Sequence, residues 1–322
     1  MKISRKHAVA AIVASWMLSS SASAAADVDT VVSFDSDSLE TPESLAFDKH
    51  GNMYVSLALT GEVRKIAPDG EQTTLAYLPI ESDVVPCGNA FGMGIMGALA
   101  LDSHRNIYVS VNSCDPSLTG VWKVEQDGET TQIASLGPDA SPNGIAYHKG
   151  KLYVADSSLG AVWRVDPDGC SPPAIWAEDP LLDPLPDFFP GPNGLQVFED
   201  EVYVAVSDRQ HIVAIPIGKK GKAKQPRVHA TGIAMDDFTF DVQGNLYGTT
   251  DPFNTVVRVA PDGDVDVLLT ADDGLDGPTA ATFGVKGDKK TLFITNAAFP
   301  FFSTTNTPSV MSLYIGIKGY NR

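Results

Sequence analysis

The sequence has few cationic residues for its length, and this shortage excludes several kinds of partner. Its 322 residues contain 23 Lys and Arg against 40 Asp and Glu, which gives a formal charge of −17 at pH 7. DNA, RNA and anionic lipid surfaces attract Lys and Arg rather than carboxylates, so we expect no nucleic-acid partner and no membrane-surface partner. Metal cations and uncharged small molecules are compatible with this charge.

Long apolar runs are also scarce, and one lies near the start of the chain. Lys2, Arg5 and Lys6 precede an apolar stretch over residues 8–18, which is followed by small residues at 22–24. A stretch of this length is too short to cross a bilayer as an uncleaved anchor but suits a cleaved export signal. We therefore expect residues 1–26 to be a signal peptide, residues 27–322 to form one domain, and the protein to be periplasmic or secreted.

No stretch shows the periodicity of apolar residues that is typical of a helix, and a sequence pattern of strands and turns recurs instead. An apolar strand is followed by a turn, a second strand of the type Asn-x-Tyr-Val, and later a Pro-Asp-Gly turn. The copies start between 43 and 54 residues apart, the length of a four-stranded propeller blade. The first strands of the copies are residues 43–48, 97–102, 143–148, 193–198, 236–241 and 279–284.

The repeat predicts an all-β protein, a six-bladed β-propeller. Apolar residues occur on both faces of each short sheet, so neighbouring blades must cover it, and radial stacking does this. The sixth copy has three clear strands and no fourth, whereas residues 29–34 form a strand that precedes the first copy. We expect this N-terminal strand to complete the last blade and close the ring.

The first strands of all six blades begin near one end of the central channel, here called the mouth. Residues at equivalent positions therefore form a ring around the axis, and four of the six offer a carboxylate or amide oxygen. Hard cations such as Ca²⁺ and Mg²⁺ prefer such ligands, and the lack of Cys and His argues against a common zinc or copper site. Singly, each has another interpretation: Asn-Gly is a common turn dipeptide, and Glu43 or Asp236-Asp237 could be solvated loop carboxylates. The ring is Glu43, Gly97, Asn143, Asn193, Asp236 and Thr279.

The chain resembles the senescence marker protein/gluconolactonase/luciferin-regenerating enzyme family of six-bladed propellers. The motifs are Pro42-Glu-Ser-Leu-Ala-Phe-Asp48, Pro192-Asn-Gly-Leu195 and Met235-Asp-Asp-Phe238. The resemblance implies that Glu43, Asn193 and Asp236 hold one divalent cation, usually Ca²⁺, with Zn²⁺, Mn²⁺ or Mg²⁺ as replacements. It also implies that Asn143 helps to bind substrate or a metal-bound water. The family's Glu-Gly-Pro and Pro-Asp-Gly are replaced at 43–45 and 235–237, and Asp237 becomes a second candidate ligand or substrate contact.

Most members of that family open lactones, so the resemblance implies a metal-dependent lactonase with a small lactone or ester as substrate. Asp236, or alternatively Asp237, would accept the proton of the attacking water. Two other functions stay open: a non-catalytic propeller that binds a ligand or glycan, and a non-hydrolytic enzyme like the strictosidine synthases, which needs no metal. The sequence does not indicate an oligomeric state.

The loops expected at the mouth are rich in apolar residues, and they carry two of the only three cysteines. Cys87 and Cys114 fall in loops at this end, so we expect a disulfide between them and a free Cys170. The apolar side chains indicate a substrate with a hydrophobic portion. They are Phe91, Met93, Met96, Phe188, Phe189, Phe253, Phe299, Phe301 and Phe302.

Overall fold

A computed structural model describes residues 28–80, 87–89, 91–186 and 190–320 of the chain. The predicted signal peptide over residues 1–26 lies outside these described residues. In the described part, no helix is long and apolar enough to cross a membrane.

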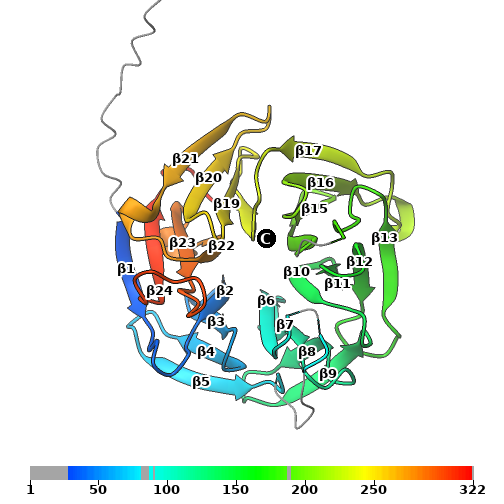
Figure 1. Ribbon diagram of the computed structural model, residues 1–322, viewed down its shortest axis with the longest axis horizontal. Helices are drawn as coiled ribbons and strands as arrows, with labels where there is room; N and C mark the ends of the chain where they lie inside the picture. The colour runs from blue at the N-terminus through cyan, green and yellow to red at the C-terminus, as the bar shows by residue number, and fades with distance from the viewer. Residues whose placement is uncertain (1–27, 81–86, 90, 187–189, 321–322) are drawn as a thin grey trace, which may run out of the picture.

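The chain forms six four-stranded antiparallel sheets arranged as blades around one axis (Figure 1), which confirms the predicted propeller. Blade 1 is β2 (Pro42–Phe47), β3 (Met53–Leu57), β4 (Glu62–Ile66) and β5 (Gln72–Tyr77). Blade 2 is β6 (Ile95–Leu101), β7 (Ile107–Asn112), β8 (Gly120–Val124) and β9 (Thr130–Ser135). Blade 3 is β10 (Pro142–His148), β11 (Lys151–Asp156), β12 (Ala161–Val165) and β13 (Ala174–Glu178).

The second half of the ring has the same order of strands. Blade 4 is β14 (Pro192–Phe198), β15 (Glu201–Val206), β16 (His211–Pro216) and β17 (Arg227–Thr231). Blade 5 is β18 (Phe238–Phe240), β19 (Leu246–Thr250), β20 (Thr255–Val259) and β21 (Val265–Leu269). Blade 6 is β22 (Pro278–Phe283), β23 (Thr291–Asn296), β24 (Ser309–Tyr314) and β1 (Val28–Ser33). Short 3₁₀ turns occur at Lys219–Gly221, Ala271–Asp273 and Lys286–Asp288.

Each seam between neighbouring blades is filled by its own apolar cluster. At the seam of blades 4 and 5, for example, Tyr203 and Ile212 pack with Phe238 and Phe240. The seam of blades 1 and 2 is filled in the same way by Tyr54, Met96 and their neighbours. Because a lone blade would leave both faces exposed, stacking around the ring is what removes these side chains from water.

The N-terminal strand closes the ring, as predicted. β1 pairs antiparallel with β24, so the last blade contains the first and the last strands of the domain. Val32 and Phe34 are buried against Leu45 of blade 1 and Phe293 of blade 6. The closure therefore depends on apolar packing across the seam as well as on the backbone ladder.

Replacing Val32 by Asp should destabilise the protein by about 3 kcal/mol or more, because it buries an unpaired charge in this seam. The neighbouring Val31 is 44% exposed and supplies a matched control. We expect Val31→Asp to change stability by roughly 0.5 kcal/mol or less. Chemical denaturation measures both, and equal effects would show that the seam does not depend on β1 packing.

The far end of the channel, opposite the mouth, is crossed by the C-terminal residues. The backbone of Tyr320 donates a hydrogen bond to Phe240 O (2.8 Å), and its ring lies 4.5 Å from the ring of Phe198. Gly319 passes so close to Phe283 that a Cβ there would lie 2.2 Å from the Phe283 side chain. The tail thus runs from blade 6 over blade 5 to blade 4.

Candidate active site at the mouth of the ring

A β-bulge at the start of the inner strands shapes the ring positions. The register shifts between Pro42 and Ser44 in blade 1, and between Pro192 and Leu195 in blade 4. Blades 2, 3 and 6 have the same irregularity at their ring residues. In blade 5 both Asp236 and Asp237 face Thr249, whose backbone accepts from Asp236 N (2.8 Å) and donates to Asp237 O (3.0 Å). Bulges re-aim side chains, so ring residues can turn toward the axis.

A closed series of side-chain hydrogen bonds fixes these bulges. In every blade a polar residue at the end of the second strand donates to a backbone carbonyl at the start of the next blade's inner strand. The pairs are Ser56–Gly97 (3.0 Å), Asn112–Pro142 (2.8 Å), Ser157–Pro192 (2.6 Å), Ser207–Met235 (2.5 Å), Thr249–Thr279 (2.8 Å) and Thr295–Glu43 (3.2 Å). We call these six residues the inter-blade belt. It sets the position of each ring residue relative to the preceding blade.

The Asn-Gly pairs of the ring are strand residues, so their interpretation as turns is wrong. Asn143 lies in β10 and Asn193 in β14. A Cβ on Gly144 would lie 2.4 Å from Asn193 O, and one on Gly194 would lie 2.3 Å from Asp236 O. Glycine is required because the inner strands approach one another closely at the axis. The same closeness brings the ring side chains together.

The structure places the carboxylates of Glu43 and Asp236 within electrostatic reach of each other. Burial raises the pKa of Glu43 to about 8, and the charges of Asp251 and Asp237 add to this. Burial also raises the pKa of Asp236 well above its usual range, reinforced by the charges of Glu43 and Asp251. A hydrogen bond from Asn193 partly opposes the shift at Asp236. These acidic side chains therefore lie in a buried region where their charged forms are disfavoured.

Two oxygen atoms in this group lack a partner in the part of the chain that the structure describes. Glu43 Oε2 and Asn193 Oδ1 are buried without a hydrogen bond among the described residues. Buried polar atoms are normally paired, so unpaired acceptors beside repelling carboxylates are what a divalent cation would satisfy. No group of three or more His, Cys, Asp and Glu side chains in the described ranges is arranged to hold a metal ion. The candidate donors are therefore two carboxylates and the Asn193 carboxamide.

The other two predicted site residues are Asn143 and Asp237, and each has its own surroundings. Asn143 is half-buried, and a Cβ on Gly97 would lie 3.3 Å from its Oδ1, so the small ring residue of blade 2 leaves room for this amide. Asp237 lines a cavity of about 330 Å³ in the channel together with residues at the other ends of the inner strands, such as Tyr147 and His148. Burial raises the pKa of Asp237 to about 7, opposed by a hydrogen bond from Phe238 N (2.8 Å). A role for Asp237 in substrate binding stays a prediction.

Asp251 was missed as a site residue in the sequence. It follows β19, and its Oδ1 is buried without a partner among the described residues. Burial raises its pKa to about 6, with a further contribution from Asp276. Its charge in turn raises the pKa of both Glu43 and Asp236. The sequence did contain a signal for Asp251. Residues two apart in a strand point to the same face, and Asp251 stands two residues after Thr249, a residue of the inter-blade belt.

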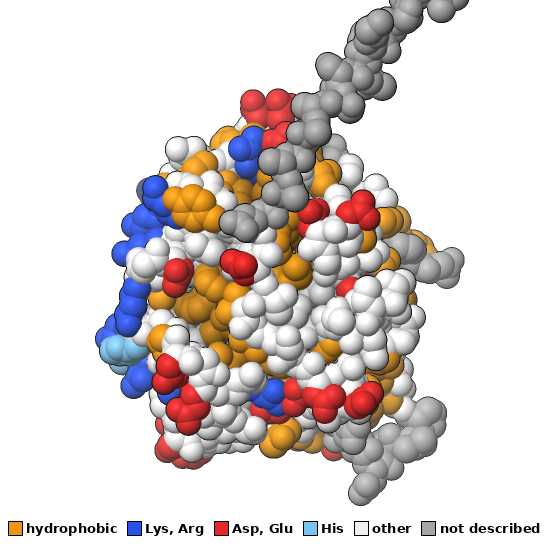
Figure 2. Space-filling model, turned by 90° about the vertical axis from the view of Figure 1, so that its left-hand side faces the viewer, with side chains coloured by type: hydrophobic (Ala, Val, Ile, Leu, Met, Phe, Trp, Pro, Cys, Tyr) orange, Lys and Arg blue, Asp and Glu red, His pale blue; other side chains and the backbone are white. Residues whose placement is uncertain are grey.

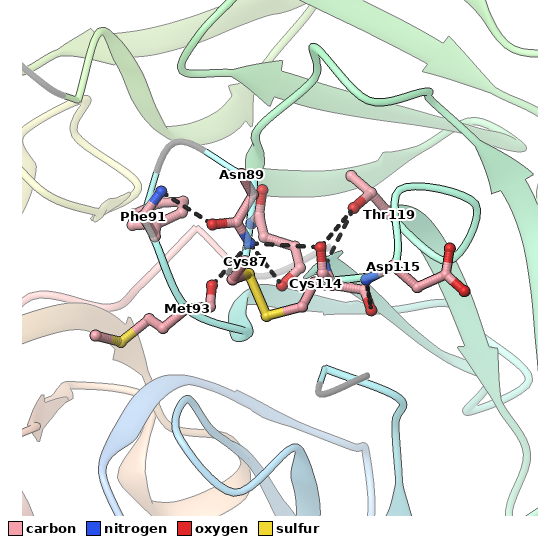
Figure 3. The surroundings of a disulfide bond; sticks show 9 residues. Cys87, Asn89, Phe91, Met93, Cys114, Asp115 and Thr119 are labelled. Atoms are coloured by element: carbon pink, nitrogen blue, oxygen red, sulfur yellow. Dashed lines mark hydrogen bonds between the residues drawn. A yellow bond between two sulfur atoms is a disulfide. The ribbon is translucent and has the colours of Figure 1, made fainter. Parts of the chain in front are cut away.

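The Cys87–Cys114 disulfide is present, as predicted, and Cys170 is free and exposed. Figure 3 shows the bond beside Asn89, whose side-chain amide donates to Met93 O (2.7 Å) and whose Oδ1 accepts from Phe91 N (3.1 Å). Cys114 N also donates to Ile80 O (3.0 Å). The disulfide ties this mouth loop to the loop after β7, and the Asn89 contacts with Phe91 and Met93 hold the mouth loop in shape.

The aromatic rim is smaller than predicted. Phe253, Phe301 and Phe302 are at least half exposed, at 63%, 50% and 60%, and Met93 is 38% exposed. Met96 and Phe299 are instead buried in apolar clusters, because Met96 belongs to β6 and Phe299 packs on Ala58 and Ala297. Phe91 is half-buried, and Phe188 and Phe189 lie outside the described residues.

Asp276 anchors the loop that carries two rim aromatics. Its carboxylate accepts hydrogen bonds from Ser303 Oγ (2.6 Å), Thr305 Oγ1 (2.6 Å) and the backbone of residues 304–306. Phe301 and Phe302 lie immediately before this anchored segment, with their ring centroids 4.8 Å apart. The exposed rings are thereby held at the mouth.

Comparison with solved structures gives several similar propellers, although no protein-family model and no curated protein sequence matches the chain. A luciferin-regenerating enzyme matches with a TM-score of 0.68 and 13% identity, over 92% of this chain and 97% of the other. A putative gluconolactonase gives 0.65 and 16%, over 93% and 96%. A calcium-binding protein, regucalcin from Agrobacterium tumefaciens str. C58, gives 0.65 and 18%, over 90% and 95%. The chain therefore shares the six-bladed fold of the senescence marker protein/gluconolactonase/luciferin-regenerating enzyme propellers, as its sequence motifs predicted.

Proposed function

We propose that this chain is a divalent-metal-dependent hydrolase that opens cyclic esters, with Ca²⁺ as the preferred ion. The observation that carries the proposal is the group at the mouth, where Glu43 and Asp236 repel each other beside the unpaired Asn193 Oδ1. Structural neighbours described as a gluconolactonase and as a calcium-binding protein support the same assignment. The predicted export signal adds that the substrate is met outside the cytosol.

In this proposal Glu43, Asn193 and Asp236 hold the cation. When bound, it polarises the ester carbonyl and lowers the pKa of a coordinated water. Asp236 accepts the proton of the attacking water as general base, and Asn143 orients the ester by hydrogen bonding. The exposed rings of Phe253, Phe301 and Phe302 hold an apolar portion of the substrate at the rim.

Metal content and lactone hydrolysis test the proposal directly. The purified protein should hold about one divalent ion per chain, EDTA should abolish opening of a panel of γ- and δ-lactones, and Ca²⁺ should restore it. The expected loss is large because the cation supplies several kcal/mol of transition-state stabilisation. Stoichiometric metal without activity on any ester would favour a ligand-binding propeller. Activity that resists EDTA would contradict the metal-dependent assignment.

A further inference from the structure

Lysine side chains gather in the turns at the far end of the propeller, although the chain is acidic overall, with a formal charge of −17. Lys49 and Lys286 lie in such turns of blades 1 and 6. Figure 2 faces blade 6 and shows Lys and Arg along one edge of the molecule, with Asp and Glu spread over the remaining surface. In blade 4, the loop between β16 and β17 adds four exposed lysines within residues 219–224. The far end therefore differs in charge from the acidic group at the mouth.

The turn after the inner strand has a different sequence in blade 3. In blades 1, 2 and 5 an Asp follows the inner strand, and its carboxylate accepts hydrogen bonds from the Asn and the Tyr that come next in the repeat. These acceptors are Asp48, Asp102 and Asp241. Blade 3 instead has His148 at the Asp position and Lys151 at the Asn position, two residues before Tyr153. A carboxylate and an amide are thus replaced by two basic side chains.

A cavity of about 400 Å³ lies in the seam of blades 3 and 4 at the far end, between this turn and the β16–β17 loop. Its walls carry four permanent cations and only one carboxylate, that of Asp200. The cations are Lys149, Lys151, Arg164 and Lys220. Cavities of this size hold small organic molecules, and the excess of cations favours an anionic one.

Ion pairs inside the protein neutralise only part of this charge. The Asp200 carboxylate is shared between Lys149 Nζ and His148, whose Nε2 lies 3.5 Å from Asp200 Oδ1. Lys151 pairs with Asp166, which stands outside the cavity lining. Two carboxylates therefore face four cations, and two positive charges remain in excess.

The loop that carries Lys220 is held in place by side chains of blade 3. Gly221 O accepts hydrogen bonds from Arg164 Nη1 (3.1 Å) and from Trp176 Nε1 (2.7 Å). Lys220 has a φ of 60°, a backbone conformation that residues other than glycine adopt uncommonly. Backbone strain of this kind clusters at sites that bind ligands. Arg164 and Lys220 are thereby fixed on opposite walls of one cavity.

We propose that this cavity is a second binding site, which takes the phosphate group of a small, soluble phosphate monoester. A phosphate monoester approaches two negative charges at neutral pH and offers three acceptor oxygens, which matches two excess cations better than a carboxylate does. Arg164 and Lys220 donate charge-assisted hydrogen bonds to these oxygens. The site lies at the opposite end of the channel from the candidate active site, so it does not depend on the proposed hydrolase.

Calorimetric titration of the purified protein with glucose 6-phosphate at pH 7.5 tests this proposal. At about 50 mM salt we expect a Kd of about 1 mM or lower, the affinity that three charge-assisted hydrogen bonds can supply. Glucose should not bind, and glucuronate, with its single negative charge, should bind at least about 10-fold more weakly. Raising the salt to about 300 mM should weaken phosphate binding severalfold. Equal affinities for the phosphate and for glucuronate would overturn the proposal.

Lys220→Gln tests the contact in the cavity. We expect it to weaken glucose 6-phosphate binding by about 10-fold, the usual effect of losing a hydrogen bond to a charged group. Lys222→Gln is the matched control, because Lys222 is an exposed lysine of the same loop that does not line the cavity. It removes the same charge and should change the Kd by less than about 2-fold, since exposed charges are screened by salt. Equal weakening in both variants would reduce the effect to general surface charge and refute the site.

Two further titrations exclude other sites for the phosphate. A divalent ion at the mouth could also bind phosphate, so the titration is repeated with Glu43→Gln. Affinity that is kept in Glu43→Gln and lowered in Lys220→Gln supports the far-end site, and the reverse pattern would place the phosphate at the mouth and refute it. Binding to phosphatidic acid vesicles without binding to glucose 6-phosphate would assign the cavity to a lipid headgroup and would also overturn the proposal.

Discussion

Replacing Asp236 by Asn should lower kcat for lactone opening by on the order of 1,000-fold, the size of effect that general-base catalysis supplies. The substitution keeps the shape of the side chain but removes the group that accepts the water proton. It also removes one of the two carboxylates proposed to hold the cation. Initial rates at saturating Ca²⁺ and substrate measure the effect, and thermal denaturation checks that the fold is kept.

Asp237→Asn is the matched control for this experiment. The two aspartates are adjacent, but Asp237 lines the axial cavity with residues at the other ends of the strands. We expect its substitution to cost less than about 10-fold in kcat, because a group without direct contact with the reacting atoms contributes little to proton transfer. The opposite order of effects would identify Asp237 as the base.

Glu43→Gln should weaken Ca²⁺ binding by about 100-fold or more, since even residues that only orient metal ligands contribute 10- to 100-fold. It should also stabilise the metal-free protein at alkaline pH. The pKa of Glu43 is about 8 in the folded protein against a usual 4.5, so the folded state binds this proton more tightly than the unfolded state. The contribution of Glu43 to stability is then fully present below pH 4.5 and is lost as the pH rises through about 8.

Removing the Glu43 carboxylate should flatten this pH dependence. At pH 8 the metal-free variant should be more stable than the wild type by on the order of 2 kcal/mol, and the two should be similar at pH 4. Saturating Ca²⁺ should reverse the order, because ligand at 100 times its Kd stabilises by about 2.7 kcal/mol. Urea denaturation at both pH values, with and without Ca²⁺, measures these differences. A loss of stability in the metal-free variant at every pH would mark Glu43 as a structural residue.

The fold was predictable because the propeller repeats one local pattern six times. Strand alternation, Pro-Asp-Gly turns and the orphan strand at 29–34 together indicated both the number of blades and the closure through β1. The Cys87–Cys114 disulfide followed from the same topology, since both loops lie at the mouth. One short apolar run could be assigned to a strand or to a helix, but six copies of the same pattern remove this ambiguity.

The candidate site was only partly predictable, for a physical reason. Ring residues share a repeat position, so Glu43, Asn193 and Asp236 could be aligned without coordinates. Asp251 comes from a loop after a second strand, and its proximity to Glu43 depends on how the blades pack. The same holds for the inter-blade belt and for Met96 and Phe299, whose burial is decided by neighbouring blades.

The latch formed by β1 and β24 constrains how this chain reaches its folded state. The strand synthesised first pairs with the strand synthesised last, so the circle stays open until translation of the domain is complete. Contacts this distant along the chain form slowly, and an unfinished ring presents two unpaired sheet edges and an uncovered blade face. Fragments truncated before Ser309 lack the partner of β1 and are therefore expected to aggregate rather than persist as smaller propellers.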